Sequence, residues 1–153
     1  MEDELQILVI DDDQVDRMSI HRSIRKAEIP ASIDDAESIE HAWKCVFEKE
    51  YDCIFLDYRL PGGNGLELLR EFRAKGLLMP VIVVTSQGDE GVAVEVMKLG
   101  GTDYLSKHSL KQEGVSQVLR NAIRAHKAER ERLQTAEALK VSQARLAEAQ
   151  RIA

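Results

Sequence analysis

The sequence predicts an α/β protein in which helices cover both faces of a parallel five-stranded sheet. Three observations support this prediction. Five short strand-like segments, of which 31–36 is the weakest, alternate with segments rich in helix-forming residues, and the connections between them are short. Residues 81–84 form an unbroken run of β-branched residues, which is typical of a strand buried on both faces. Strands that alternate with helices join through right-handed crossovers, so all five are expected to run in the same direction.

The helices at 37–50, 65–76 and from 112 onward are predicted from apolar residues three and four positions apart, and the helix at 14–27 from its helix-forming composition. The polar residues Asp13, Asn64 and Asp89 are suited to cap the helices that follow them. Segment 89–99 is the poorest helix former, because Gly91 and three valines lower its helix propensity. We expect strands at residues 5–10, 31–36, 52–56, 81–84 and 102–105, and helices at 14–27, 37–50, 65–76, 89–99 and from 112 onward.

The 153 residues carry a net charge of −6, which is unevenly spread. Residues 1–125 hold 15 basic and 23 acidic side chains, a net charge of −8, whereas residues 126–153 carry +2. We therefore divide the chain into a domain at 1–125 and a helical linker at 126–153. An acidic body of this kind binds nucleic acid poorly, because the phosphate backbone repels it.

No feature of the sequence predicts a membrane-bound or secreted protein. Residues 1–4 lack the basic region of a signal peptide, and no apolar run approaches the roughly 18 residues that span a bilayer. Cys45 and Cys53 are too far apart for a redox or zinc motif. We expect a cytoplasmic protein that has no contact with a membrane.

Polar residues follow four of the five predicted strands: Asp11 and Asp12, Asp57, Thr85, and Lys107 two residues beyond the last strand. The carboxyl ends of parallel strands share one edge of a sheet, so these side chains are expected to lie together. Helix capping explains three converging carboxylates poorly, because they repel one another unless a cation is present. The carboxylates suit Mg²⁺, and Lys107 with Thr85 suits a phosphate.

Four motifs in this order resemble the receiver domain of two-component response regulators. The resemblance runs from about Leu5 to about Ala125 and implies a flavodoxin-like (βα)5 three-layer sandwich, followed here by an extended C-terminal helix. The motifs are Val9-Ile10-Asp11-Asp12-Asp13, Leu56-Asp57 with Leu60-Pro61-Gly62-Gly63-Asn64-Gly65, Val83-Val84-Thr85-Ser86, and Asp103-Tyr104-Leu105-Ser106-Lys107.

The resemblance implies a phosphoacceptor switch more than an enzyme. Asp57 would accept a phosphoryl group from the phosphohistidine of a histidine kinase or phosphotransfer protein. Carboxylates are competent nucleophiles for forming acyl phosphates, and the remaining groups need only position and neutralise charge. The resemblance implies that Asp12, Asp57 and the Arg59 carbonyl bind Mg²⁺, with support from Asp11. Thr85 and Lys107 would bind the phosphate. Thr85 and Tyr104 would act as the switch residues.

The sequence departs from the family after Lys107. Receivers usually carry a cis proline at the next position, whereas this chain has His108. A non-proline cis bond costs about 2.5–4 kcal/mol, so we expect the loop carrying Lys107 to follow a different path.

Two alternatives remain open. Asp11 and Asp13 match the nucleophile and acid-base pair of haloacid-dehalogenase phosphatases, with Asp89 and Glu90 as a later acidic pair, although Asp57 would then have no role. The second alternative is a receiver that binds a partner without being phosphorylated. Substituting Asp11 and Asp57 separately distinguishes a phosphatase from a receiver.

Residues 126–153 contain no glycine, proline or aromatic residue, which favours a continuous helix. A weak coiled-coil seam is expected there, in which only Leu139 and Leu146 are large and apolar. We expect this seam to form a homodimer. The final residues, 142–153, resemble the helix that leads into PAS sensor domains, so an output domain is expected beyond this chain. The seam positions are Arg132, Ala136, Leu139, Gln143, Leu146, Gln150 and Ala153.

Overall fold

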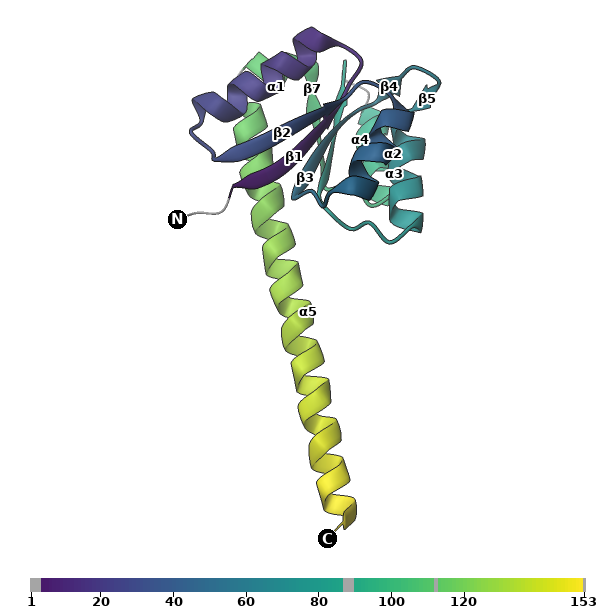
Figure 1. The fold of residues 1–153 in the computed structure, drawn as a ribbon, viewed down its shortest axis with the longest axis vertical. Coiled ribbons are helices and arrows are strands. Elements are labelled where there is room, and N and C mark those ends of the chain that lie inside the picture. The colour runs from purple at the N-terminus through teal and green to yellow at the C-terminus, as the bar shows by residue number, and fades with distance from the viewer. Residues whose placement is uncertain (1–3, 87–89, 112, 153) are drawn as a thin grey trace. The chain divides into compact units, whose positions relative to one another are not determined.

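The computed structural model of the chain describes residues 4–86, 90–111 and 113–152, which fall into two units, 1–123 and 124–153. The first unit holds a parallel sheet with the strand order β2-β1-β3-β6-β7 (Figure 1). Its strands are β1 (Leu5–Ile10), β2 (Ala31–Ala36), β3 (Cys53–Asp57), β6 (Val81–Thr85) and β7 (Asp103–Ser106). The predicted flavodoxin-like α/β fold is confirmed.

The helices begin and end within two residues of the predicted bounds. They are α1 (Gln14–Lys26), α2 (Ile39–Glu48), α3 (Gly65–Ala74), α4 (Glu90–Lys98) and α5 (Gly114–Ile152). The Asp13 side chain caps α1 by accepting the Val15 N–H at 2.8 Å, and Asn64 caps α3 in the same way through Leu66 at 2.7 Å. The proposed cap Asp89 lies outside the described residues.

Three short elements were not predicted. The strands β4 (Arg59–Leu60) and β5 (Gly63–Asn64) form a two-residue antiparallel ladder after β3. A 3₁₀ helix, η1 (Lys107–Lys111), follows β7. All three occur in connections of a few residues, where hydrophobic periodicity carries no signal.

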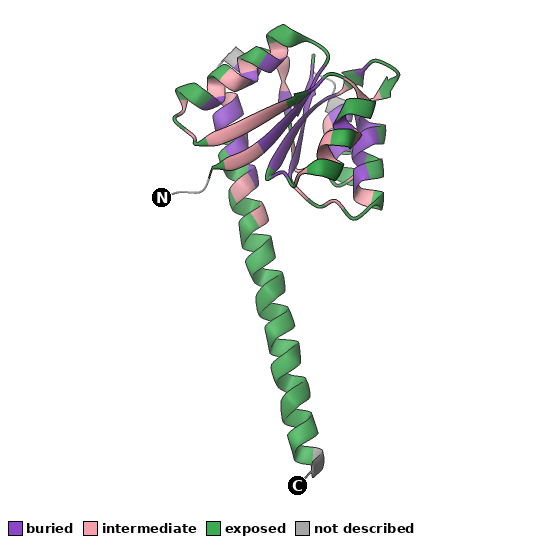
Figure 2. Cartoon of the chain, viewed as in Figure 1, coloured by how far each residue is buried: buried purple, intermediate pink, exposed green. Residues whose placement is uncertain are grey.

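Alternate residues of the strands supply two separate cores, one on each face of the sheet. Leu8 and Ile10 pack with α2, α3 and α4, whereas Ile7 and Val9 pack with α1 and the first turns of α5. Figure 2 shows the central strands buried between these helix layers. Because both faces of the central strands β3 and β6 are covered, these strands need apolar residues at almost every position, which explains their continuous apolar runs in the sequence.

The helix α5 is continuous from Gly114 to Ile152, as the sequence predicts. Val115, Leu119 and Ala122 are buried against the sheet, whereas the described side chains from Lys127 onward are exposed. Within the described part of the chain, no helix is both long enough and apolar enough to cross a membrane.

Phe72 provides a test of this packing. It is fully buried on α3 and meets Trp43 of α2 edge to face, with the ring centroids 4.9 Å apart. We expect Phe72→Ala to lower the free energy of unfolding by about 3–5 kcal/mol, because the transfer energy is lost and a cavity remains. Urea unfolding followed by circular dichroism measures this change.

Phe47→Ala is the matched control. Phe47 stacks on the same Trp43 but is 72% exposed, so its loss should cost about 1 kcal/mol or less. Equal costs for the two substitutions would contradict the assignment of Phe72 to the core.

Candidate functional site

Asp11 and Asp57 lie at the carboxyl ends of neighbouring strands. The register pairs Ile10 of β1 with Leu56 of β3, which places the two aspartates side by side at the edge of the sheet. The strand order reverses between β1 and β3, and ligands of open α/β sheets bind at this point. Both side chains are buried, with 2% of Asp11 and 4% of Asp57 exposed.

Asp12 completes a cluster of three carboxylates. Oxygens of Asp11, Asp12 and Asp57 lie within 4.8 Å of one another. The Oδ1 atom of Asp11 accepts the Asp13 N–H at 2.9 Å, but its buried Oδ2 atom has no hydrogen-bond partner. An unsatisfied carboxylate oxygen beside two further carboxylates fits a hard divalent cation such as Mg²⁺. The three predicted metal-binding carboxylates are therefore brought together by the fold.

Burial shifts the ionisation of these carboxylates. It raises the pKa of Asp11 to about 7, and the negative charge of Asp57 raises it as well, while the Asp13 N–H and Lys107 oppose the shift. Burial also raises the pKa of Asp57, against the opposing effects of Lys107 and the Arg59 N–H. The fold therefore holds two carboxyl groups where their charged forms are unfavourable without a cation.

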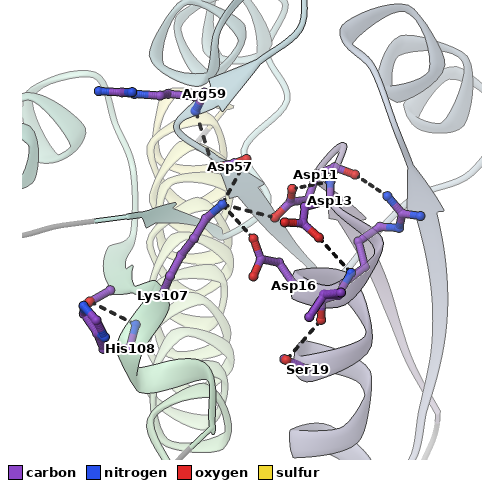
Figure 3. Close-up of polar contacts among 11 residues, drawn as sticks. Asp11, Asp13, Asp16, Ser19, Asp57, Arg59, Lys107 and His108 are labelled. Carbon is purple, nitrogen blue, oxygen red and sulfur yellow. Dashed lines mark hydrogen bonds and ion pairs between the residues drawn. The ribbon is translucent and has the colours of Figure 1, made fainter.

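Lys107 follows the edge strand β7, and its side chain points toward this cluster (Figure 3). Its Nζ atom lies 3.5 Å from Asp57 Oδ2 and 4.0 Å from Asp11 Oδ2. Its shortest contact is a 2.7 Å hydrogen bond to Asp16 Oδ2. Burial disfavours the ammonium, yet the hydrogen bond to Asp16 and the nearby carboxylates hold the pKa of Lys107 above its usual value.

The connection after Lys107 differs from the family pattern, as the sequence indicates. No peptide bond among the described residues is cis, so Lys107 and His108 are joined by a trans bond. The His108 N–H instead donates to Ser106 Oγ at 3.2 Å as the chain enters η1. Lys107 nevertheless lies within reach of Asp57.

Thr85 and Tyr104 lie on adjacent strands beside this cluster. Thr85 ends β6, directly after Val84, which pairs with Asp57, and it is buried. Tyr104 pairs with Val83 on β7 and is 41% exposed. The two predicted switch residues thus lie on neighbouring strands, with Thr85 inside the fold and Tyr104 at its surface.

The segment after Asp57 holds this aspartate through its backbone. The Arg59 N–H donates to Asp57 Oδ1 at 3.4 Å, and the Gly65 N–H donates to the Tyr58 carbonyl at 2.8 Å. A Cβ atom at Gly65 would lie 2.2 Å from the Asp57 carbonyl oxygen. Gly62 has open space around it but adopts a φ of +82°, which favours glycine.

Two residues of this region were missed by sequence reasoning. Asp16 binds Lys107, although the two are 91 positions apart in the chain. Arg17 is buried and donates to the Asp11 carbonyl at 2.7 Å, which fixes the connection between β1 and α1. An acidic residue in the first turn of a helix is usually explained by the helix dipole, so Asp16 gave no separate signal.

Comparison of the sequence with known proteins identifies relatives of this chain. The response regulator receiver domain model matches residues 7–120. The chain is 38% identical over 112 residues to the transcriptional regulatory protein FixJ of Azorhizobium caulinodans, covering 70% of this chain and 50% of FixJ. It is 33% identical over 115 residues to the transcriptional regulatory protein ResD of Bacillus subtilis, covering 75% of this chain and 47% of ResD. The chain spans about half the length of these relatives.

Solved structures show the same architecture. A response regulator receiver domain protein from Clostridium thermocellum is 28% identical, with a TM-score of 0.71 over 81% of this chain and 98% of that one. NtrX from Brucella abortus superposes with a TM-score of 0.78 over 87% of this chain and 30% of that one. Its identity of 24% supports the fold alone.

We expect Asp11 to make the metal-free protein less stable as the pH rises from about 4 to about 7. The folded carboxyl keeps its proton up to a pKa of about 7, whereas the unfolded carboxyl releases it near 3.8. The destabilisation is absent below the unfolded pKa and complete above the folded pKa, at about 1.4 kcal/mol per unit of pKa difference. Urea unfolding with a chelator, at several pH values, measures it.

The Asp11→Asn variant should gain stability relative to the wild type across this pH range. The exposed Glu40→Gln substitution in the first turn of α2 serves as the control and should leave the pH dependence unchanged. A stability difference between wild type and Asp11→Asn that stays constant with pH would show that Asp11 does not titrate in this way.

Proposed function

This chain belongs to the response regulator receiver domain family, and we propose that it accepts a phosphoryl group on Asp57 in a two-component phosphorelay. The observation that carries the proposal is the position of Asp57, which is buried in one cluster with Asp11 and Asp12 and lies 3.5 Å from the Lys107 ammonium. Receiver domains act as signalling switches. The phosphodonor would be a histidine kinase or a phosphotransfer protein.

The proposed chemistry uses the Asp57 carboxylate as nucleophile. One of its oxygens attacks the phosphorus of a phosphohistidine, the P–N bond breaks, and the leaving imidazole takes up a proton. Asp12, Asp57 and the Arg59 carbonyl would hold Mg²⁺, with Asp11 supporting it. When bound, the ion supplies positive charge to the phosphoryl oxygens. Lys107 and the Thr85 hydroxyl would bind those oxygens from the other side.

Thr85 and Tyr104 would carry the signal outward. A phosphoryl group would draw the Thr85 hydroxyl inward, and the half-exposed Tyr104 ring would follow, changing the surface near α4. Residues 1–125 would form the receiver, and residues 126–153 the linker to an output domain outside this chain. We propose a cytoplasmic location and no binding of nucleic acid by the acidic receiver body.

The alternatives are less favourable. For a phosphatase with Asp11 as nucleophile, Asp13 would have to act as acid and base, but its side chain caps α1 through Val15. Asp89 of the proposed acidic pair lies outside the described residues. A receiver that functions without phosphorylation would have no use for the unsatisfied Asp11 oxygen beside Asp57.

We expect acetyl phosphate to phosphorylate the protein on Asp57 only when Mg²⁺ is present. Intact-mass spectrometry detects the added phosphoryl group. Asp57→Asn should abolish the addition, because the amide has no nucleophilic oxygen of comparable strength, whereas Glu67→Gln on the exposed side of α3 should retain it. Incorporation that survives Asp57→Asn would refute the assignment. If it also disappears in Asp11→Asn, the result would favour the phosphatase alternative.

Mg²⁺ should also stabilise the folded protein without any phosphodonor. A ligand at 100 times its Kd adds about 2.7 kcal/mol if it binds only the folded state. Thermal unfolding with and without Mg²⁺ measures the effect, and Asp12→Ala should erase it because a carboxylate of the cluster is lost. If Asp12→Ala and wild type responded equally to Mg²⁺, the proposed ligand set would be wrong.

The C-terminal unit is expected to pair with its copy in a second chain. Leu139 and Leu146 are 57% and 63% exposed on α5, and isolated helices gain most of their stability from packing an apolar face. We expect a weak dimer in sedimentation equilibrium that is lost in the double variant Leu139→Glu/Leu146→Glu. Val141→Glu lies off the seam, is 42% exposed and should keep the dimer. A wild type that stays monomeric at high concentration would exclude this route.

A further inference from the structure

Asp16 is the closest partner of Lys107. Its Oδ2 atom accepts a hydrogen bond from the ammonium at 2.7 Å, compared with 3.5 Å to Asp57 and 4.0 Å to Asp11. Both partners are half-buried, with 20% of the Asp16 side chain and 24% of the Lys107 side chain exposed. Figure 3 shows dashed lines from the ammonium to all three carboxylates, those of Asp57, Asp11 and Asp16.

The structure of α1 does not require this carboxylate. Asp13 already caps the helix by accepting the Val15 N–H, and the Arg17 side chain holds the preceding connection through the Asp11 carbonyl. A negative charge in the first turn of a helix is favourable, but it typically contributes only about 0.3–1 kcal/mol. The principal specific contact of Asp16 is therefore the one with Lys107.

We propose that Asp16 competes with the phosphoryl group for Lys107, and so limits how tightly the phosphorylated form of the site is held. This inference rests on the proposed function. The Lys107 ammonium faces three carboxylates, those of Asp11, Asp16 and Asp57. Phosphoryl oxygens on Asp57 would have to share the three N–H donors of Lys107 with Asp16, or displace Asp16 from its hydrogen bond.

Asp16 would also keep Lys107 away from the carboxylates that hold the metal. Without its 2.7 Å partner, the ammonium would move toward Asp57 and Asp11, where it repels a divalent cation. Removal of one carboxylate would also make the site less negative. Both effects weaken the binding of Mg²⁺ while they strengthen the binding of a phosphate-like anion. Asp16 is thus a positioning residue with opposite effects on the two ligands.

Calorimetric titration of wild type and Asp16→Asn tests this inference, with Mg²⁺ alone and with beryllium fluoride, a phosphoryl mimic, at saturating Mg²⁺. The loss of competition from a partly exposed ion pair predicts a beryllium fluoride Kd up to about fivefold lower in Asp16→Asn. The Kd for Mg²⁺ should rise. General damage to the fold would weaken both ligands, so the opposite signs distinguish a positioning role from a structural one.

Three further variants complete the test. Glu67→Gln removes a carboxylate from the first turn of α3, far from Lys107 in the chain, and should change neither Kd. Asp16→Glu keeps the charge and should stay close to wild type. If Asp16→Asn does not fold, Asp16→Ser provides the same loss of charge for both titrations.

The outcomes separate this inference from the proposed function. Unchanged or weaker beryllium fluoride binding by Asp16→Asn, with normal binding by wild type, would overturn the inference alone. Wild-type protein that binds no beryllium fluoride and gains no phosphoryl group on Asp57 would overturn both.

Discussion

The repulsion among carboxylates at one edge of the sheet is the constraint on which the site depends. A parallel sheet with the order found here brings Asp11 and Asp57 together because their strands are neighbours, and packing on both faces buries them. Burial and mutual repulsion raise the pKa of Asp11 to about 7. The fold can keep such a cluster only because cations, Lys107 among them, can neutralise it. Charge balance therefore links the architecture to the chemistry.

The sequence predicts the main elements of this fold because burial leaves a direct pattern. Strands covered on both faces need apolar residues throughout, so β1, β3 and β6 are visible as continuous apolar runs. The β4–β5 ladder and η1 leave no such pattern, since two-residue pairings and a five-residue 3₁₀ helix are too short for hydrophobic periodicity. Local chemistry explains the caps Asp13 and Asn64, which were both predicted.

The site was predictable to the extent that it follows from strand ends. Asp57 and Thr85 close strands, and Lys107 follows one, so the parallel topology alone places them at one edge. Asp16 and Arg17 lie on a helix, and their contacts depend on side-chain reach across elements. No periodicity encodes a contact between residues 91 positions apart. The replacement of proline by His108 was visible in the sequence, but the position of Lys107 could not be predicted from it, because that position depends on the path of the folded backbone.

Gly62 and Gly65 lie three residues apart after β3, yet different constraints require glycine at the two positions. Gly62 has open space and a positive φ, so asparagine, which adopts left-handed conformations most readily after glycine, is the natural substitute there. Gly65 has no positive φ but lies against the Asp57 carbonyl oxygen, so every side chain is excluded. In a saturation library selected for folding, position 62 would retain a short, biased set of residues and position 65 only glycine. Comparing the two profiles would separate torsional from steric selection within one loop.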